Sequence, residues 1–222
     1  MKLSNNILKE CLKNVYFING TVYAGKSTMV RMLAEKYDMI HCGENYHSKL
    51  SERVATPEIQ PNLSYFKTMK DWQEFINRTP DEYELWIQGV TEECSEFEIA
   101  ILLQLCASGR KVIVDTNISV QDLHEISDYD HVAIMLSPQS LSVDKFFERE
   151  DEDKQFLLAQ IQAAKDPVRT MENFRACLAR INSEEIYNEF ENSGFFTIYR
   201  DHSQKDTKAQ TLARLEAHFK LA

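Results

Sequence analysis

The sequence of 222 residues lacks a long apolar run and any cluster of five or more basic residues. No stretch approaches the roughly 18 apolar residues of a membrane-spanning helix, and the first six residues do not have the pattern of a signal peptide. The formal net charge of −10 disfavours attraction to nucleic acid or to anionic membranes. We therefore expect a soluble, cytoplasmic protein that binds neither nucleic acid nor membranes.

The sequence also lacks any Cys-x-x-Cys pair. Its five cysteines are odd in number and widely spaced, at Cys11, Cys42, Cys94, Cys106 and Cys177. This spacing supports neither a zinc site nor a disulfide framework. We expect the cysteines to be small, buried, reduced side chains.

One motif stands out in the chain, Gly20-Thr21-Val22-Tyr23-Ala24-Gly25-Lys26-Ser27, followed by Thr28. Glycine, four residues and Gly-Lys-Ser form the pattern of the phosphate-binding P-loop, and here an apolar run precedes it and an amphipathic run (26–37) follows it. The glycines let main-chain N–H groups converge on an anion, and the helix N-terminus adds partial positive charge. The residues expected to bind the nucleotide are Gly20, Tyr23, Ala24, Gly25, Lys26, Ser27 and Thr28. Within this set Lys26 is expected to contact the β- and γ-phosphates and Ser27 to contact Mg²⁺.

The rest of the chain alternates strand and helix patterns. Strands are predicted at about 15–19, 39–42, 112–115, 131–136 and 195–199. A long helix is predicted over about 82–108, almost wholly apolar from Ile99 to Cys106, and the segment 47–80 is the least regular. This alternation predicts one α/β domain whose mostly parallel sheet is covered by helices on both faces.

This layout resembles the nucleoside/nucleotide-kinase branch of the P-loop proteins and is similar to small-metabolite kinases such as shikimate and gluconate kinases. The resemblance covers nearly the whole chain in layout and is specific in sequence at 20–28 and, less so, at Asp115. It implies a three-layer α/β/α fold with a five-stranded parallel sheet of order 2-3-1-4-5. It also implies one domain (1–222) with a substrate-binding insertion at 47–80 and a lid within about 138–182. The Asn-Lys-x-Asp and Asp-x-x-Gly motifs of GTPases are absent.

Three further residues are candidates for the chemistry. Asp115 ends an apolar strand, where a carboxylate either holds Mg²⁺ together with Ser27 or caps the following loop. Glu44 follows the second strand, where related kinases carry an acid that contacts the acceptor hydroxyl, although it is equally well read as an ordinary loop residue. Arg149 lies in the lid segment and could neutralise the transferring phosphoryl group, but acidic residues surround it, which also suits a solvated helix junction.

The sequence indicates the acceptor side of the site less clearly than the nucleotide side. A phosphorylated acceptor would need cations such as Lys49, Arg53 and Arg78. An uncharged alcohol would need aromatic and amide side chains, and these are present at Tyr46, Tyr65, Phe66, Trp72, Gln73, Trp86 and Gln88. Both alternatives stay open from the sequence.

Together these observations predict an ATP- and Mg²⁺-dependent phosphotransferase that acts on a small-molecule acceptor, a nucleoside, a nucleotide or another hydroxyl metabolite. The expected catalytic residues are Lys26, Glu44, Asp115 and Arg149, and the base is expected near Arg200, after the fifth strand. A nucleotide-binding regulatory ATPase without a small-molecule acceptor is the alternative. The protein is expected to be a monomer or a homodimer.

Overall fold

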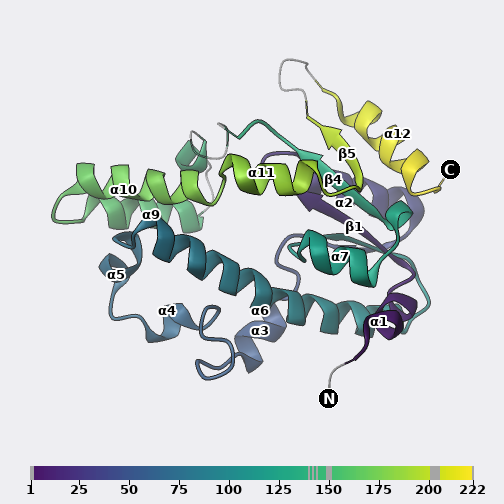
Figure 1. Cartoon of the computed structure of the whole chain (residues 1–222), viewed down its shortest axis with the longest axis horizontal. Coiled ribbons are helices and arrows are strands. Elements are labelled where there is room, and N and C mark those ends of the chain that lie inside the picture. The colour runs from purple at the N-terminus through teal and green to yellow at the C-terminus, as the bar shows by residue number, and fades with distance from the viewer. Residues whose placement is uncertain are drawn as a thin grey trace. The chain divides into compact units, whose positions relative to one another are not determined.

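The computed structural model describes residues 3–139, 141, 143, 145–148, 152–200 and 206–221. The chain divides into two compact units, and Figure 1 shows its course. The first unit consists of Met1–Arg53, Cys94–Ser137 and Asn188–Ala222, and the second of Val54–Glu93 and Pro138–Tyr187. The second unit includes most of the predicted insertion and lid. That the chain is one domain with a substrate-binding insertion and a lid stays a prediction.

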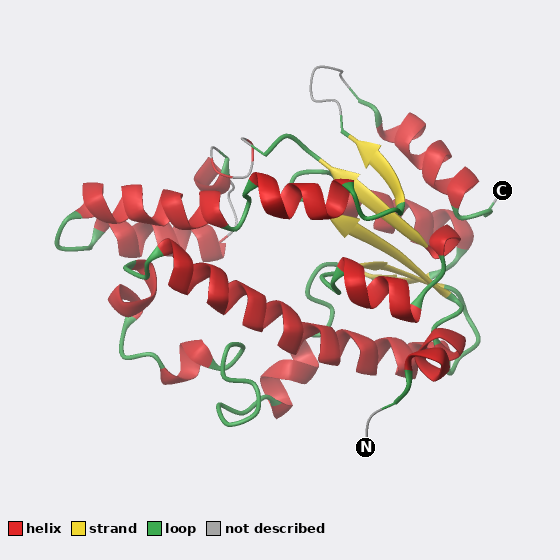
Figure 2. Ribbon diagram, in the orientation of Figure 1, coloured by secondary structure: helices red, strands yellow, loops and turns green. Residues whose placement is uncertain are grey.

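The first unit contains a five-stranded parallel sheet (Figure 2). Its strands are β1 (Val15–Gly20), β2 (Ile40–Cys42), β3 (Val112–Asp115), β4 (Val132–Leu136) and β5 (Phe196–Tyr199). Their order in the sheet is β2-β3-β1-β4-β5, and every neighbouring pair is parallel. The predicted α/β fold, with sheet order 2-3-1-4-5 and helices on both faces, is confirmed.

The central strands are apolar because both of their faces are covered. Every residue of β3 and β4 is buried. The helices α2 (Lys26–Tyr37) and α12 (Lys208–His218) share a hydrophobic cluster with one face of the sheet. The helices α1 (Asn5–Cys11) and α7 (Val120–Ile126) pack against each other, and Figure 1 shows them on the opposite face.

The long helix α6 (Pro80–Cys106) begins in the second unit and ends in the first. Among the described residues, the other α-helices are α3 (Ser48–Val54), α4 (Tyr65–Thr68), α5 (Trp72–Ile76), α9 (Glu152–Gln162), α10 (Pro167–Arg180) and α11 (Glu184–Glu191). In the second unit an aromatic core forms around Phe75 and Phe174. Asp166 caps α10, since its side chain accepts a hydrogen bond from the main-chain N–H of Arg169.

The structure also bears on the cysteines and on the length of the apolar helices. None of the five cysteines forms a disulfide, and the expectation that they are buried is wrong for Cys11, which is exposed, and for Cys106, which is only half-buried. Helix α1, which contains Cys11, has no buried residue, so the apolar side chains there cover little of the core. Within the described ranges no helix has the length and apolar character needed to span a membrane.

Candidate functional site

The predicted P-loop connects β1 to α2 in the first unit. Three of its residues have positive φ: Gly20 (123°), Tyr23 (63°) and Gly25 (92°). A Cβ atom at Gly20 would lie 2.1 Å from the carbonyl oxygen of Met135, so no larger residue fits there without moving β4. The N–H of Thr21 donates to that same oxygen at 3.0 Å, which fixes the loop against β4. The loop therefore has a conformation that requires glycine.

Ser137 holds the other side of this loop. It follows β4, is 2% exposed, and its Oγ donates to the carbonyl oxygen of Val22 at 2.6 Å. Its own N–H donates to Oγ1 of Thr21 at 2.8 Å. No local sequence pattern predicts this role of Ser137, because its contacts join residues 115 and 116 positions apart.

The ammonium group of Lys26 contacts the main chain of its own loop. Its Nζ donates to the carbonyl oxygens of Gly20 and Thr21, both at 3.1 Å. It also lies 3.9 Å from Oδ1 of Asp115. The motif lysine therefore faces the carboxylate predicted at the end of the neighbouring strand.

Asp115 is almost wholly buried, with 4% of its surface exposed. The hydroxyl of Ser27 donates to its Oδ2 at 2.7 Å. Burial raises the pKa of the Asp115 carboxyl, while Lys26 and Ser27 oppose that rise. The structure thus brings Lys26, Ser27 and Asp115 together, and Ser27 and Asp115 offer the hard oxygen donors that Mg²⁺ prefers.

Glu44 is an exposed residue in the loop after β2, and β2 pairs with β3. Its negative charge acts on Asp115 and contributes to the raised pKa of that carboxyl. The carboxyl ends of β1, β2 and β3 therefore carry two acids and one lysine in the same region. This excess of negative charge favours a bound cation.

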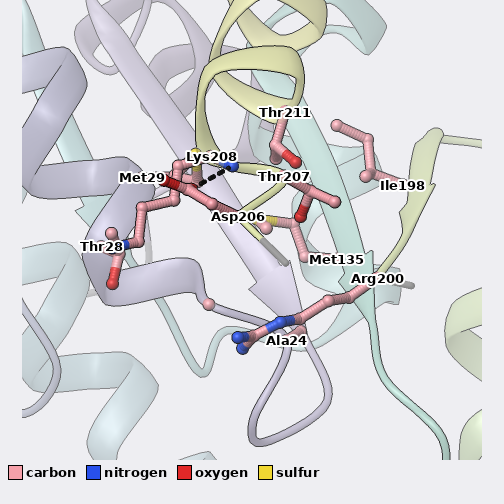
Figure 3. A pocket seen from close by; sticks show the side chains of 11 residues that line it. Ala24, Thr28, Met29, Met135, Ile198, Arg200, Asp206, Thr207, Lys208 and Thr211 are labelled. Carbon is pink, nitrogen blue, oxygen red and sulfur yellow. Dashed lines mark hydrogen bonds between the residues drawn. The ribbon is translucent and has the colours of Figure 1, made fainter. Parts of the chain in front are cut away.

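A cavity of about 320 Å³ lies beside the P-loop in the same unit (Figure 3). Its lining residues are Ala24, Gly25, Thr28, Met29, Met135, Ile198, Arg200, Asp206, Thr207, Lys208 and Thr211. Figure 3 shows Arg200 reaching toward Ala24, and its Nη1 donates to the carbonyl oxygen of Tyr23 at 2.5 Å. The cavity is partly apolar, through Met29, Met135 and Ile198, and is rimmed by polar side chains.

The second unit has a cavity of its own, of about 460 Å³, lined mostly by polar side chains together with the rings of Tyr65 and Trp86. The guanidinium of Arg78 lies 3.9 Å above the ring of Tyr65, and the indole of Trp86 donates to the carbonyl oxygen of Asn62 at 3.1 Å. These aromatic candidates for the acceptor site are thus engaged in packing within their unit. Arg149, the predicted lid cation, lies outside the described residues.

The comparisons with known proteins add no relative. No protein-family model matches the chain, and no curated protein matches it in sequence. The sheet order and the parallel strands are consistent with a P-loop fold.

Proposed function

We propose that the protein is an ATP-dependent phosphotransferase that moves the γ-phosphoryl group to a hydroxyl group of a small molecule. The observation that carries this proposal is the meeting of Lys26, Ser27 and Asp115 at the carboxyl ends of β1 and β3. Open parallel sheets bind their ligands at this edge. The P-loop sequence explains the first two residues, and the parallel pairing of β1 with β3 explains the third.

The loop and the first turn of α2 would bind the phosphates of the donor. The first N–H groups of a helix have no partner within the helix, and here they follow a loop with left-handed residues at Tyr23 and Gly25. Lys26 donates to two carbonyl oxygens of its own loop, and it can exchange these weak partners for phosphate oxygens. Its charge would then oppose the charge that develops on the transferring group.

Ser27 and Asp115 would hold a magnesium ion. When bound, Mg²⁺ neutralises the charge of the phosphate oxygens and orients them. The residues fit this role because a buried carboxylate and a hydroxyl lie 2.7 Å apart, with a second acid, Glu44, near them. Lys26 lies 3.9 Å from the Asp115 carboxylate and offsets part of its charge.

Glu44 would face the acceptor. It is exposed at the end of β2, where its carboxylate can accept a hydrogen bond from an acceptor hydroxyl and take its proton. In phosphoryl transfer such a residue contributes mainly by orienting the attacking oxygen. The cavity lined by Met29, Ile198 and Arg200 would receive the base of the nucleotide, and Arg200 could contribute a cation–π contact there.

The test is a panel of acceptors mixed with MgATP and the full-length protein. Nucleosides, nucleoside monophosphates, sugars, sugar acids and amino-alcohol compounds are supplied separately, and the formation of ADP is followed. We expect at least one class to raise ADP formation well above the rate with water alone. Binding of MgATP with no stimulation by any class would instead support a regulatory nucleotide-binding protein.

A further inference from the structure

A buried carboxylate that the proposed reaction does not use lies in the first unit, on the part of α6 that belongs to it. Glu98 is 0% exposed, and its neighbours on α6 in the sequence are apolar from Ile99 to Leu103. A buried carboxylate is costly unless its oxygens accept hydrogen bonds. An apolar residue would fill the same place at lower cost, so the contacts of Glu98 point to what the acid is for.

On one side Glu98 contacts the loop that follows β3. The Thr116 hydroxyl donates to Oε2 of Glu98 at 2.5 Å, and the N–H of Asn117 lies 3.3 Å from Oε1 as a second donor. Thr116 and Asn117 directly follow Asp115, the proposed metal ligand. Glu98 therefore holds the chain immediately after this ligand.

On its other side Glu98 contacts the loop that follows β2. The phenol of Tyr46 donates to Oε2 at 3.3 Å. Nδ1 of His47 lies 3.8 Å from Oε1; this ring is 3% exposed, and Nδ1 has no hydrogen-bond partner within the part of the chain that the structure describes. Tyr46 and His47 follow Glu44 by two and three positions, so the same carboxyl group reaches both loops.

Because Glu98 is buried, its ionised carboxyl group is stabilised mainly by these hydrogen-bond donors. Burial raises the pKa of Glu98, and the hydrogen bonds from Thr116, Asn117 and Tyr46 oppose the rise. Burial also lowers the pKa of His47, which keeps that ring neutral as a neighbour. The cluster is thus held together by hydrogen bonds to one carboxyl group.

We infer that Glu98 is a positioning residue that joins the loop carrying Glu44 to the loop following Asp115 and so sets the spacing between the acceptor end and the metal end of the site. This inference rests on the proposed function for the roles of Glu44 and Asp115. The joining of the two loops itself rests on the hydrogen bonds alone. Glu98 needs no contact with either substrate to act in this way.

Hydrogen–deuterium exchange of the full-length protein tests the joining without knowledge of the acceptor. Tyr46→Phe removes the donor of the first loop, Thr116→Val removes a donor of the second, and Glu98→Gln weakens both. Leu102→Ala is the matched control, because Leu102 is buried one turn further along α6 and has no part in the site. Thermal unfolding of each variant accompanies the exchange measurements.

We expect exchange of residues 43–48 to rise about tenfold in Tyr46→Phe and that of 116–119 to rise similarly in Thr116→Val. Glu98→Gln should raise both segments and leave the P-loop peptide, 20–28, at the wild-type rate. Leu102→Ala should raise exchange throughout the unit. Unchanged loops in Glu98→Gln, or the same general rise as in the control, would overturn the inference.

Turnover separates a positioning role from a structural one. The probe is MgATP with water as the acceptor, together with any acceptor class that the panel identifies. Glu98→Gln should bind MgATP within about twofold of the wild-type affinity and lose about tenfold in turnover. Equal turnover would overturn the positioning role. A wild-type protein that does not bind MgATP would remove the proposed function, while the exchange pattern would still decide whether Glu98 joins the loops.

Discussion

Among single residues, Asp115 destabilises the fold through its buried carboxylate and is also the proposed ligand of Mg²⁺. Its carboxyl is buried and its pKa is raised, above all by burial. An acid with a raised pKa in the folded state is more easily ionised when the protein unfolds. The free energy of unfolding therefore falls as the pH rises from the usual range of the carboxyl through its raised pKa, and at neutral pH the ionised group destabilises the protein.

Replacement of Asp115 should make the protein more stable and weaken its Mg²⁺-dependent binding of ATP. We expect Asp115→Asn to raise the free energy of unfolding at neutral pH by about 1 kcal/mol, because the amide keeps an oxygen for Ser27 and carries no charge. The same variant should lose the Mg²⁺-dependent part of its affinity for ATP. Thermal unfolding and calorimetric titration measure the two effects.

The control for this variant is Glu35→Gln, which removes the same charge from an exposed position on α2. It should change neither quantity. In the wild-type protein the affinity that Mg²⁺ adds should also fall as the pH is lowered through the raised pKa of Asp115. An Asp115→Asn protein with wild-type Mg²⁺ dependence would contradict the metal role.

A substitution of Arg200 can distinguish the contribution of the base to ATP binding from the contribution of the phosphates. Arg200 lines the cavity beside the P-loop and donates to the carbonyl oxygen of Tyr23. If it stacks on the base, Arg200→Ala should weaken ATP binding about tenfold. Inorganic triphosphate, which has no base, should bind the variant as it binds the wild-type protein. Equal weakening of both ligands would show that Arg200 acts by shaping the P-loop instead.

At the scale of the elements, the sequence was sufficient to predict where strands and helices lie. Helix α2 and strand β3 have the predicted bounds, and α6 begins two residues before the predicted start of about 82. These elements have strong local patterns of apolar residues, glycine and proline. The meeting of Ser27 with Asp115 also follows, because the carboxyl ends of parallel strands lie at one edge of the sheet.

The contacts of side chains with distant loops could not be predicted in this way. Arg200 reaches a carbonyl group 177 residues away, and Glu98 gathers donors from two loops. Nothing in a local pattern specifies such partners. For Glu98 one signal is present, since an acid that directly precedes an apolar helical run, Ile99 to Leu103, needs hydrogen-bond partners where that run is buried.

Helix α6 offers a test of packing at the same scale. Gly89 lies within this helix, and a Cβ atom there would lie 2.2 Å from Nδ2 of Asn62. Asn62 is held by Glu93, which accepts from its side chain at 2.7 Å and from its N–H at 3.0 Å. An alanine in a helix usually gains about 1 kcal/mol over glycine, but here it must displace the Asn62 side chain from Glu93.

We therefore expect Gly89→Ala to lower the free energy of unfolding by about 1–3 kcal/mol. Denaturant unfolding measures the change. The double variant Gly89→Ala/Asn62→Ala should recover part of the loss, because the smaller side chain removes the clash. A Gly89→Ala protein more stable than the wild type would contradict this clash with the Asn62 side chain.

For the whole molecule, every residue of the proposed donor site belongs to the first unit. The second unit has its own aromatic core, in which Phe174 is 0% exposed and packs against Phe75 and Tyr83. We expect Phe174→Leu to cost about 1–2 kcal/mol of stability and to leave the affinity for MgATP unchanged. The stability and MgATP affinity of Phe174→Leu are compared with those of Ile134→Val, a mild change in the core of the first unit. Loss of MgATP affinity in Phe174→Leu would show that the donor site depends on the second unit.

The proposed phosphotransferase activity is measured directly by the transfer of labelled γ-phosphate from ATP by the wild-type and Lys26→Ala proteins. Both proteins are compared with Mg²⁺ and the full set of acceptors, after thermal unfolding has shown that the variant is folded. We expect the wild-type protein to label at least one acceptor and Lys26→Ala to lose at least about a hundredfold in rate. A folded Lys26→Ala protein with full turnover would contradict the proposed function.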